Sequence, residues 1–246
     1  MPLGELRQGA EARSDFRDFA AALSGEKLSV IAELKKASPS RGLLRPDFRP
    51  AEIAESYQQA GAAALSVLTE EEFFQGSLSY LNAARGAVQI PVLRKDFIVD
   101  EYQVYESAAA GADAFLLIVA ALDNRDLKHF IELADGLHVA ALVEVHTEDD
   151  LGRAIDSGAK IIGINNRNLN TLEVSLETSF RLREKIPPSC LAVSESGIKS
   201  GADLEKLAKA GFNAVLIGEH LMLAGDPGEE LSRLLKSAPP LKMAGA

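Results

Sequence analysis

Short apolar runs rich in β-branched residues alternate along the chain with longer stretches of helical spacing. Four segments repeat one phrase, in which a glycine ends a helical stretch and an apolar strand follows it. The phrases start at Gly61, Gly111, Gly158 and Gly211, at intervals of about 50 residues. One further apolar run precedes the first phrase, and another lies in each gap between phrases. Each interval therefore corresponds to two strand–helix units.

The pattern predicts eight strands. Four follow the repeated glycines, and the other four are expected at residues 30–35, 91–95, 139–145 and 191–194. The clearest helical stretches between them cover residues 51–60, 101–110, 125–134, 147–157, 179–185 and 201–210. This eightfold alternation is typical of an α/β protein with a single (β/α)8 TIM barrel. A doubly wound open sheet is the alternative, but no Gly-x-Gly-x-x-Gly turn follows the first strand.

The segment before the first strand predicts a short N-terminal helical extension over residues 1–27. Residues 1–13 are polar, and we expect them to be mobile. Ser14 is a candidate N-cap for one short helix. The apolar face of that helix would carry Phe16, Phe19, Ala20 and Leu23. The barrel is assigned to residues 28–238, and residues 239–246 form a C-terminal tail.

Composition narrows the class of protein. The chain has 246 residues, of which 47% are hydrophobic and 25% charged, as is ordinary for a globular protein with a full core. It has neither an apolar run long enough to span a membrane nor the apolar core of an export signal, so we expect a cytoplasmic protein without a membrane partner. The net charge of −10 argues against nucleic acid as a partner. A local basic cluster can still bind a small anion.

Cysteine and histidine show no catalytic or metal-binding pattern. The single cysteine, Cys190, cannot form an internal disulfide and lies in an apolar run, so we expect a buried, unreactive thiol. The four histidines are not at metal-ligand spacing, and we expect no metal site. His146 follows Glu144 closely but is expected on the opposite face of that strand.

Charged and amide side chains follow the carboxyl ends of the predicted strands, which form the active-site rim of a TIM barrel. The main candidates are Glu33, Lys35, Lys95, Glu144, Asn165, Arg167 and Glu195. Because strand side chains alternate between faces, Glu33 and Lys35 share one face. If Glu144, Asn165 and Glu195 also point inward, the barrel mouth carries a ring of charge. A ligand site is then favoured over a plug of ion pairs, since burying charge is costly.

Glycines at two turns predict an anion site. Ser196-Gly197 and Gly218-Glu219 follow the last two strands, where glycine lets backbone N–H groups approach an anion. Residues 219–224 are expected to form the short extra helix that often lies beside a phosphate in this fold. The carboxylate of Glu219 is then expected to point away from a bound phosphate.

The loop after the second strand combines acidic and aromatic residues. We expect the acidic run 70–72 to be solvated. Of Phe73 and Phe74, one is expected to pack in the core and the other to stack on an aromatic ligand.

Six ordered motifs resemble the indole-3-glycerol phosphate synthase family, from about residue 15 to about residue 235. The motifs are AELKKASPSRG at 32–42, LTE at 68–70 with the loop to Gly76, LRKDFI at 93–98, LVEVH at 142–146, IGINNR at 162–167 and SESGI at 194–198. The resemblance implies an enzyme without cofactor or metal. It would act on a small anionic substrate, 1-(2-carboxyphenylamino)-1-deoxyribulose 5-phosphate. It would close the indole ring with loss of CO2 and water.

The same resemblance implies roles for individual residues. Lys95 is similar to the general acid of the family, Glu144 to the acid/base of dehydration, and Lys35 to the cation that holds the substrate carboxylate. Orienting roles are implied for Glu33, Asn165 and Glu195. Substrate binding is implied for Phe74, Arg167, Ser196, Gly197 and Gly218.

The sequence departs from the family pattern in two places. Glu219 stands where the family often has serine, which removes one hydroxyl contact to the phosphate. The segment before the first strand is shorter than is usual in the family, where part of it covers the mouth of the active site.

Two other functions stay open. One is another phosphate-binding barrel enzyme, such as a phosphoribosylanthranilate isomerase. That reaction would require an Asp/Cys pair at the rim, whereas Cys190 lies at the wrong end of its strand. The other is a non-catalytic barrel that acts as a binding partner.

Overall fold

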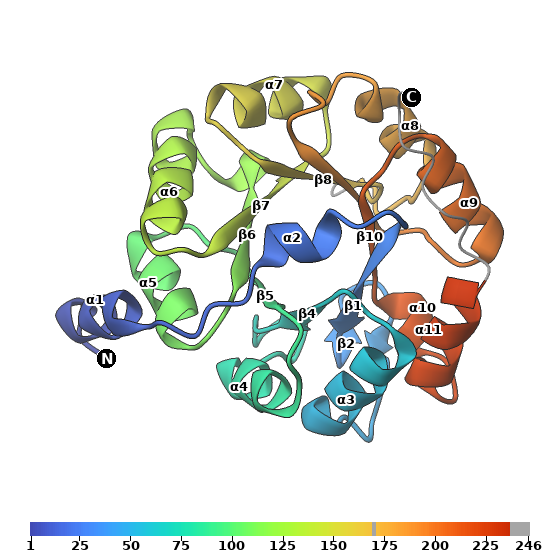
Figure 1. Cartoon of the computed structure of the whole chain (residues 1–246), viewed down its shortest axis with the longest axis horizontal. Helices are drawn as coiled ribbons and strands as arrows, with labels where there is room; N and C mark the ends of the chain where they lie inside the picture. The colour runs from blue at the N-terminus through green and yellow to red at the C-terminus, as the bar shows by residue number, and fades with distance from the viewer. Residues whose placement is uncertain (169–170, 237–246) are drawn as a thin grey trace.

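A closed barrel of eight parallel strands forms the centre of the protein (Figure 1). The structure is a computed structural model, and it describes residues 1–168 and 171–236. In sequence order the barrel strands are β1 (Ser29–Leu34), β4 (Ala64–Leu68), β5 (Val92–Lys95), β6 (Ala114–Ile118), β7 (Ala140–Val145), β8 (Ile161–Asn165), β9 (Leu191–Glu195) and β10 (Ala214–Ile217). Consecutive strands are neighbours, and β10 closes the barrel against β1. The predicted (β/α)8 barrel is confirmed.

Helices surround the barrel on its outside (Figure 1). They are α3 (Pro50–Ala60), α4 (Leu78–Ala87), α5 (Glu101–Ala109), the 3-10 turn η1 (Val119–Ala121), α6 (Asn124–Gly136), α7 (Glu148–Asp156), α8 (Glu177–Arg183), α9 (Gly201–Lys209), α10 (Glu219–Met222) and α11 (Pro227–Lys236). A short antiparallel hairpin, β2 (Ala37–Ser38) and β3 (Gly42–Leu43), lies in the loop after β1. Gly61 ends α3 with a φ of 99°, which explains why glycine begins the repeated phrase.

The interior of the barrel changes from apolar to charged along the strands. Inward apolar side chains from all eight strands form one buried cluster, which includes Ile31, Ala64, Leu93, Ala114, Leu116, Leu142, Ile161, Val193, Ala214 and Leu216. The next inward position on four of these strands is charged. Glu33 follows Ile31, Lys95 follows Leu93, Glu144 follows Leu142 and Glu195 follows Val193, each two residues later. A one-residue shift of a strand would exchange its inner and outer faces, so burial of the apolar layer also fixes the position of the charged layer.

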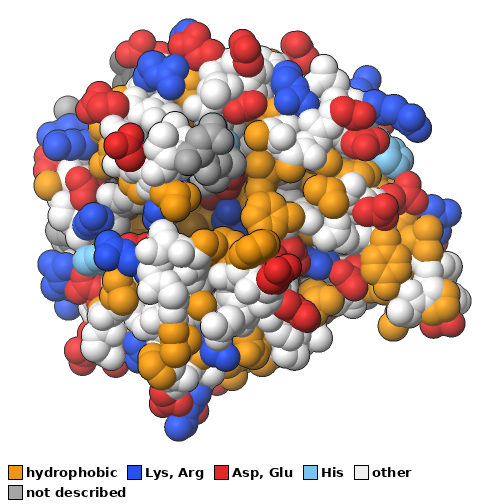
Figure 2. Space-filling model, turned by 180° about the vertical axis from the view of Figure 1, so that it is seen from behind, with side chains coloured by type: hydrophobic (Ala, Val, Ile, Leu, Met, Phe, Trp, Pro, Cys, Tyr) orange, Lys and Arg blue, Asp and Glu red, His pale blue; other side chains and the backbone are white. Residues whose placement is uncertain are grey.

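The carboxyl ends of the strands open onto the face shown in Figure 2, opposite the face that α2 (Phe19–Leu23) covers in Figure 1. A hollow lies near the middle of this face, with basic side chains inside it and hydrophobic side chains around it. None of the helices in the described residues is both long and apolar enough to cross a membrane.

The N-terminal extension differs from its predicted form. Residues predicted to be mobile form a helix, α1 (Leu3–Ala12), which packs along the outside of α5 and buries Leu6 and Ala10. The helix expected to begin after Ser14 begins instead at Phe19, because the Asp18 side chain accepts the N–H of Ala21 as its cap. As predicted, Phe19 and Leu23 are buried; they close the apolar interior at the amino end of the barrel. The tail predicted for residues 239–246 lies outside the described residues.

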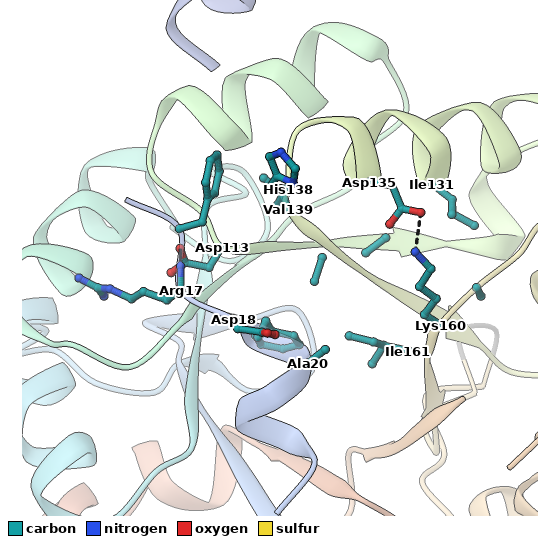
Figure 3. Close-up of a pocket in the computed structure, with 15 residues that line it drawn as sticks. Arg17, Asp18, Ala20, Asp113, Ile131, Asp135, His138, Val139, Lys160 and Ile161 are labelled. Carbon is teal, nitrogen blue, oxygen red and sulfur yellow. Dashed lines mark hydrogen bonds and ion pairs between the residues drawn. The ribbon is translucent and has the colours of Figure 1, made fainter. Parts of the chain in front are cut away.

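A pocket of about 410 Å³ lies at the amino end of the barrel, between the extension and the start of β7 and β8 (Figure 3). Its polar wall includes Lys160, whose ammonium is 2.6 Å from a carboxylate oxygen of Asp135. All the rim candidates lie at the other end of the strands, so this pocket is separate from the predicted site.

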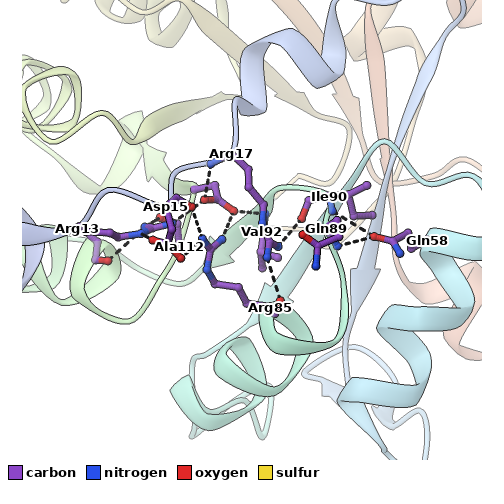
Figure 4. Close-up of polar contacts among 11 residues, drawn as sticks. Arg13, Asp15, Arg17, Gln58, Arg85, Gln89, Ile90, Val92 and Ala112 are labelled. Atoms are coloured by element: carbon purple, nitrogen blue, oxygen red, sulfur yellow. Dashed lines mark hydrogen bonds and ion pairs between the residues drawn. The ribbon is translucent and has the colours of Figure 1, made fainter.

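Charged residues, among them Arg13, Asp15, Arg17 and Arg85, cluster where the extension meets the barrel (Figure 4). At the centre of this cluster is the carboxylate of Asp113, which fixes the extension to the barrel. This carboxylate is 1% exposed, and its two oxygens are 2.7 Å from the Arg13 guanidinium and 2.6 Å from the Arg85 guanidinium. It also accepts the backbone N–H groups of Arg17 and Val92, each at 3.0 Å. With four donors for two oxygens, the buried charge is fully satisfied, which is the condition for burying it without a large penalty.

Candidate active site

All eleven residues predicted for the site line two adjoining pockets at the carboxyl end of the barrel. The first, of about 270 Å³, includes Glu33, Lys35, Phe74, Lys95, Glu144, Asn165, Arg167, Glu195 and Ser196. The second, of about 450 Å³, shares four of these residues and adds Gly197 and Gly218. We refer to them as the inner pocket and the outer pocket. The inner pocket has an aromatic residue in its wall and the outer pocket has glycine turns, so the two differ in chemical character.

Lys95 is at the centre of the inner pocket. Its Nζ is 3.0 Å from Oε2 of Glu144 and 3.6 Å from Oε2 of Glu195. These side chains come from β5, β7 and β9, and the predicted inward orientation of both carboxylates is confirmed. The preceding residue, Arg94, points outward and binds Asp96 and Glu106, which fixes the end of β5. The ammonium is therefore held on a rigid strand.

The charges of this cluster alter one another's protonation. Burial alone would lower the pKa of Lys95, but the carboxylates of Glu144, Glu195 and Glu33 outweigh it and raise the pKa. Burial likewise opposes ionisation of Glu144, yet Lys95 and then His146 lower its pKa. Burial raises the pKa of Glu195 more than the attraction of Lys95 lowers it. The neighbouring Glu144 and Glu33 raise it further, to about 8. Near neutral pH the cluster thus favours a charged Lys95, an ionised Glu144 and a Glu195 that keeps its proton.

Space for Glu195 comes from a glycine on the neighbouring strand. A Cβ at Gly163 would lie 2.1 Å from Oε1 of Glu195, so the carboxyl group could not keep its present position beside any other residue. That oxygen has no hydrogen-bond partner among the described residues, as is consistent with a carboxyl that resists ionisation.

The Glu33–Lys35 pair predicted from strand alternation is confirmed, with Nζ 3.1 Å from Oε1. It lies where the inner and outer pockets meet. A Cβ at Gly218 would be 2.7 Å from the Glu33 carboxylate. Glycine at this turn therefore makes room for Glu33 as well as leaving the backbone open to a ligand.

The aromatic wall of the inner pocket was predicted only in part. Phe74 lines it as expected, but Phe73 is exposed rather than in the core. The acidic run is not simply solvated, because the Glu70 carboxylate accepts the backbone N–H groups of residues 72, 73 and 74 and so shapes the loop that presents Phe74. Phe97 also lines this pocket and was not predicted, although it stands two residues after Lys95.

The prediction for His146 was wrong. Its Nε2 is 3.4 Å from Oε1 of Glu144, and neither ring nitrogen has a hydrogen-bond partner among the described residues. Strand side chains two residues apart share a face, so alternation itself should have placed His146 beside Glu144.

The outer pocket combines glycine turns with charged side chains. Ser196 and Gly197 both have positive φ, 68° and 84°, and form the turn after β9. The short helix predicted at residues 219–224 is present as α10. Glu219, expected to point away from a bound phosphate, lines this pocket, and its carboxylate lies between the guanidinium groups of Arg41 and Arg167, at 3.2 and 3.4 Å. Arg41, in the loop after β1, was not singled out from the sequence.

Cys190 lines neither the inner nor the outer pocket. Cys190 is partly buried just before β9, at the amino end of the barrel, with its thiol 3.3 Å from the carbonyl oxygen of Ala159. Within the described part of the chain, no group of three or more His, Cys, Asp and Glu side chains is placed to hold a metal ion.

Comparison with known proteins adds the family. A model of the indole-3-glycerol phosphate synthase family matches residues 1–234. Indole-3-glycerol phosphate synthase of Polaromonas naphthalenivorans is 53% identical over 237 residues, covering 95% of this chain and 90% of the relative. The protein of the same name from Chloroherpeton thalassium is 58% identical over 210 residues, covering 84% of this chain and 81% of the relative.

Solved structures with low sequence identity share the barrel alone. A 3-hexulose-6-phosphate synthase from Salmonella typhimurium aligns with a TM-score of 0.69 at 16% identity, covering 85% of this chain and 98% of that one. A thiamine phosphate pyrophosphorylase from Pyrococcus furiosus aligns with a TM-score of 0.64 at 16% identity, covering 86% and 96%. The family model and the close relatives, taken with the predicted motifs, place the chain in the indole-3-glycerol phosphate synthase family, whose members are carboxy-lyases of tryptophan biosynthesis.

Proposed function

We propose that the protein catalyses the indole-3-glycerol phosphate synthase reaction. It would convert 1-(2-carboxyphenylamino)-1-deoxyribulose 5-phosphate to indole-3-glycerol phosphate by ring closure, loss of CO2 and loss of water. The observation that carries the proposal is the Lys95 ammonium, 3.0 Å from Glu144 in a pocket with an aromatic wall. Family membership supports the same reaction.

The first step needs an acid. When the aryl carbon attacks the ketone of the ribulose chain, a C–C bond forms and negative charge builds on the carbonyl oxygen. Lys95 is the donor for that oxygen, since its three carboxylate neighbours keep the amine protonated. Departure of CO2 then returns an electron pair to the ring.

The second step needs an acid and a base in turn. Loss of water requires a proton for the departing hydroxyl and removal of a proton from the neighbouring atom. Glu144 is the candidate for both roles: it is ionised at rest and hydrogen-bonded to Lys95, so it would first act as the base that takes the proton of the neighbouring atom. The carboxyl group formed in this way would then give that proton to the departing hydroxyl, which leaves as water. Asn165 lies in the same pocket, and Asn165 and Glu195 would orient the ribulose hydroxyls and the two catalytic groups.

Binding would use both pockets. In the inner pocket, Phe74 would lie against the aromatic ring, and Lys35, oriented by Glu33, would hold the ring carboxylate. In the outer pocket, Ser196, Gly197 and Gly218 would receive the phosphate through hydroxyl and backbone N–H groups, with Arg167 at the junction. No step requires a cofactor or a metal.

The alternative functions receive less support from the geometry. The isomerase alternative requires a thiol at the rim, and Cys190 is at the opposite end of the barrel. A non-catalytic barrel would not need a proton-bearing carboxyl beside an ammonium, which is costly to bury.

The test is to mix the purified protein with the carboxyphenylamino-ribulose phosphate and follow indole fluorescence. We expect product from the wild-type protein. We expect Glu144→Gln to lose most of its turnover and to accumulate a ring-closed species that retains its hydroxyl, seen by mass spectrometry of the quenched reaction. If the wild-type protein yields no indole product, the proposed reaction is wrong. If Glu144→Gln turns over like wild type, the role of Glu144 is wrong.

A further inference from the structure

Glu219 binds two arginines from two different loops. Its Oε1 is 3.2 Å from Nε of Arg41, in the loop after β1, and its Oε2 is 3.4 Å from Nη2 of Arg167, just after β8. The Glu219 side chain is 22% exposed and that of Arg167 26%, so the contact between them is partly shielded from water. Each carboxylate oxygen thus has its own cation.

These three side chains line the outer pocket together with the Ser196, Gly197 and Gly218 turns. The two arginines are therefore available to an anion bound at those turns. Such an anion would meet the Glu219 carboxylate in the same space, one residue after Gly218. Lys35 also lines this pocket, but it is already paired with Glu33 at 3.1 Å.

A carboxylate and a phosphate compete for guanidinium groups because both accept paired N–H donors in the same geometry. A carboxylate at this position lowers phosphate affinity in two ways: it occupies the donors, and it repels the incoming negative charge. Partial exposure screens the repulsion, so we expect an effect of a few-fold rather than of several orders of magnitude.

We propose that Glu219 is a built-in competitor for the phosphate group of the ligand. Its carboxylate holds Arg41 and Arg167 until an anion takes at least one of them, so Glu219 limits affinity at the outer pocket and assists release of a phosphorylated product. This inference rests on the proposed function for the identity of the ligand, but the competition itself concerns any phosphate at these turns.

The test measures binding of inorganic phosphate by calorimetry at fixed ionic strength. We expect Glu219→Gln to bind phosphate about fivefold more tightly than wild type, because two arginines are released and one repulsive charge is removed. Glu219→Asp keeps the charge, and its Kd should stay within about twofold of wild type. In an Arg41→Gln background, the gain from Glu219→Gln should be smaller, since one of the contested donors is gone.

Glu132→Gln is the matched control. It removes the same charge from an exposed ion pair on α6 and should leave the Kd unchanged. A Kd for Glu219→Gln equal to or weaker than that of wild type overturns the proposal, and so does an aspartate variant that behaves like the glutamine variant. Thermal unfolding of each variant, measured alongside, identifies loss of phosphate binding through misfolding. Failure of the wild-type protein to form indole product would instead overturn the proposed function and leave the phosphate comparison interpretable.

Discussion

The two ends of the barrel each hold a buried charge cluster, and they are built in opposite ways. At the amino end, Asp113 has four donors for its two oxygens, and its cationic partners are arginines. At the carboxyl end, one ammonium serves two carboxylates, and Oε1 of Glu195 has no partner in the described residues. The first cluster is balanced, whereas the second has an excess of carboxylate.

The difference separates a structural cluster from a chemical one. Arginine cannot release its proton, so the amino-end cluster has a single charge state and holds the extension in place. Lysine and glutamate exchange protons, so the carboxyl-end cluster can move a proton at little cost, which is what acid–base catalysis requires. Incomplete pairing at a buried site is thus a more useful sign of function than the number of charges.

The largest expected effect is on turnover at the carboxyl end. Lys95→Ala should lower kcat by roughly 10²–10⁴, the usual contribution of one general acid. Stability should change little, because Glu144 can take up a proton when the ammonium is gone and Glu195 already holds one near neutral pH. Indole fluorescence and urea denaturation measure the two effects. Lys160→Ala removes an exposed lysine at the other end of the barrel and should leave both unchanged. Turnover near that of wild type would remove Lys95 from the mechanism.

The next effect is on stability at the amino end. Asp113→Asn should lower the free energy of unfolding by about 3–5 kcal/mol, because it removes the buried carboxylate that Arg13 and Arg85 share. The carboxylate that remains beside both arginines, that of Asp15, is largely exposed. Asp135→Asn, which breaks the exposed pair with Lys160, should cost less than about 1 kcal/mol. Urea denaturation of both variants makes the comparison. A stable Asp113→Asn variant with impaired kcat would contradict the division between the two clusters.

The last effect, the smallest when it is expressed per pH unit, concerns the pH dependence of stability. The pKa of Glu195 is about 8 in the folded protein and near 4.5 when unfolded, so the folded state keeps a proton that the unfolded state has released between these values. This contribution is complete below about pH 4.5, decreases as the pH rises and is lost above about pH 8. The wild-type stability, relative to Glu195→Gln, should therefore fall by up to ~1.4 kcal/mol per pH unit in that window.

Urea denaturation of both proteins at about pH 5.5, 7 and 8.5 measures the difference. Lys95, Glu144 and Glu33 also face Glu195 and affect its pKa. Glu33→Gln is a useful comparison, because it removes one of these charges and keeps Glu195 in place. A difference that stays level or grows with pH would show that Glu195 is ionised in the folded protein.

The sequence was most informative where periodicity and burial act together. Inward positions two residues apart predicted the placement of Glu144 and Glu195 correctly, because the apolar layer below them fixes the strand register. The repeated glycines predicted the ends of helices, because the chain there adopts a positive φ that glycine accepts more readily than other residues. These features depend on short-range rules that a single sequence contains.

Features that depend on contacts between distant segments were not predicted. Residues 3–12 have few apolar side chains, yet they form a helix because α5 covers Leu6 and Ala10. The two arginine partners of Glu219, which come from loops far apart in sequence and hold its carboxylate in the outer pocket, were not foreseen. Glu70 was read as a solvated residue, although its role is to bind three backbone N–H groups of its own loop.

The missing side chain at Gly163 has a consequence for how this barrel can vary. Because a methyl group there would lie 2.1 Å from a Glu195 oxygen, positions on two neighbouring strands share a single volume. A designer who wishes to place a side chain at position 163 on β8 must also move or shorten Glu195 on β9, because the barrel would otherwise be overpacked at this point. Redesign of this enzyme for other substrates therefore has to choose the residues at positions 163 and 195 together.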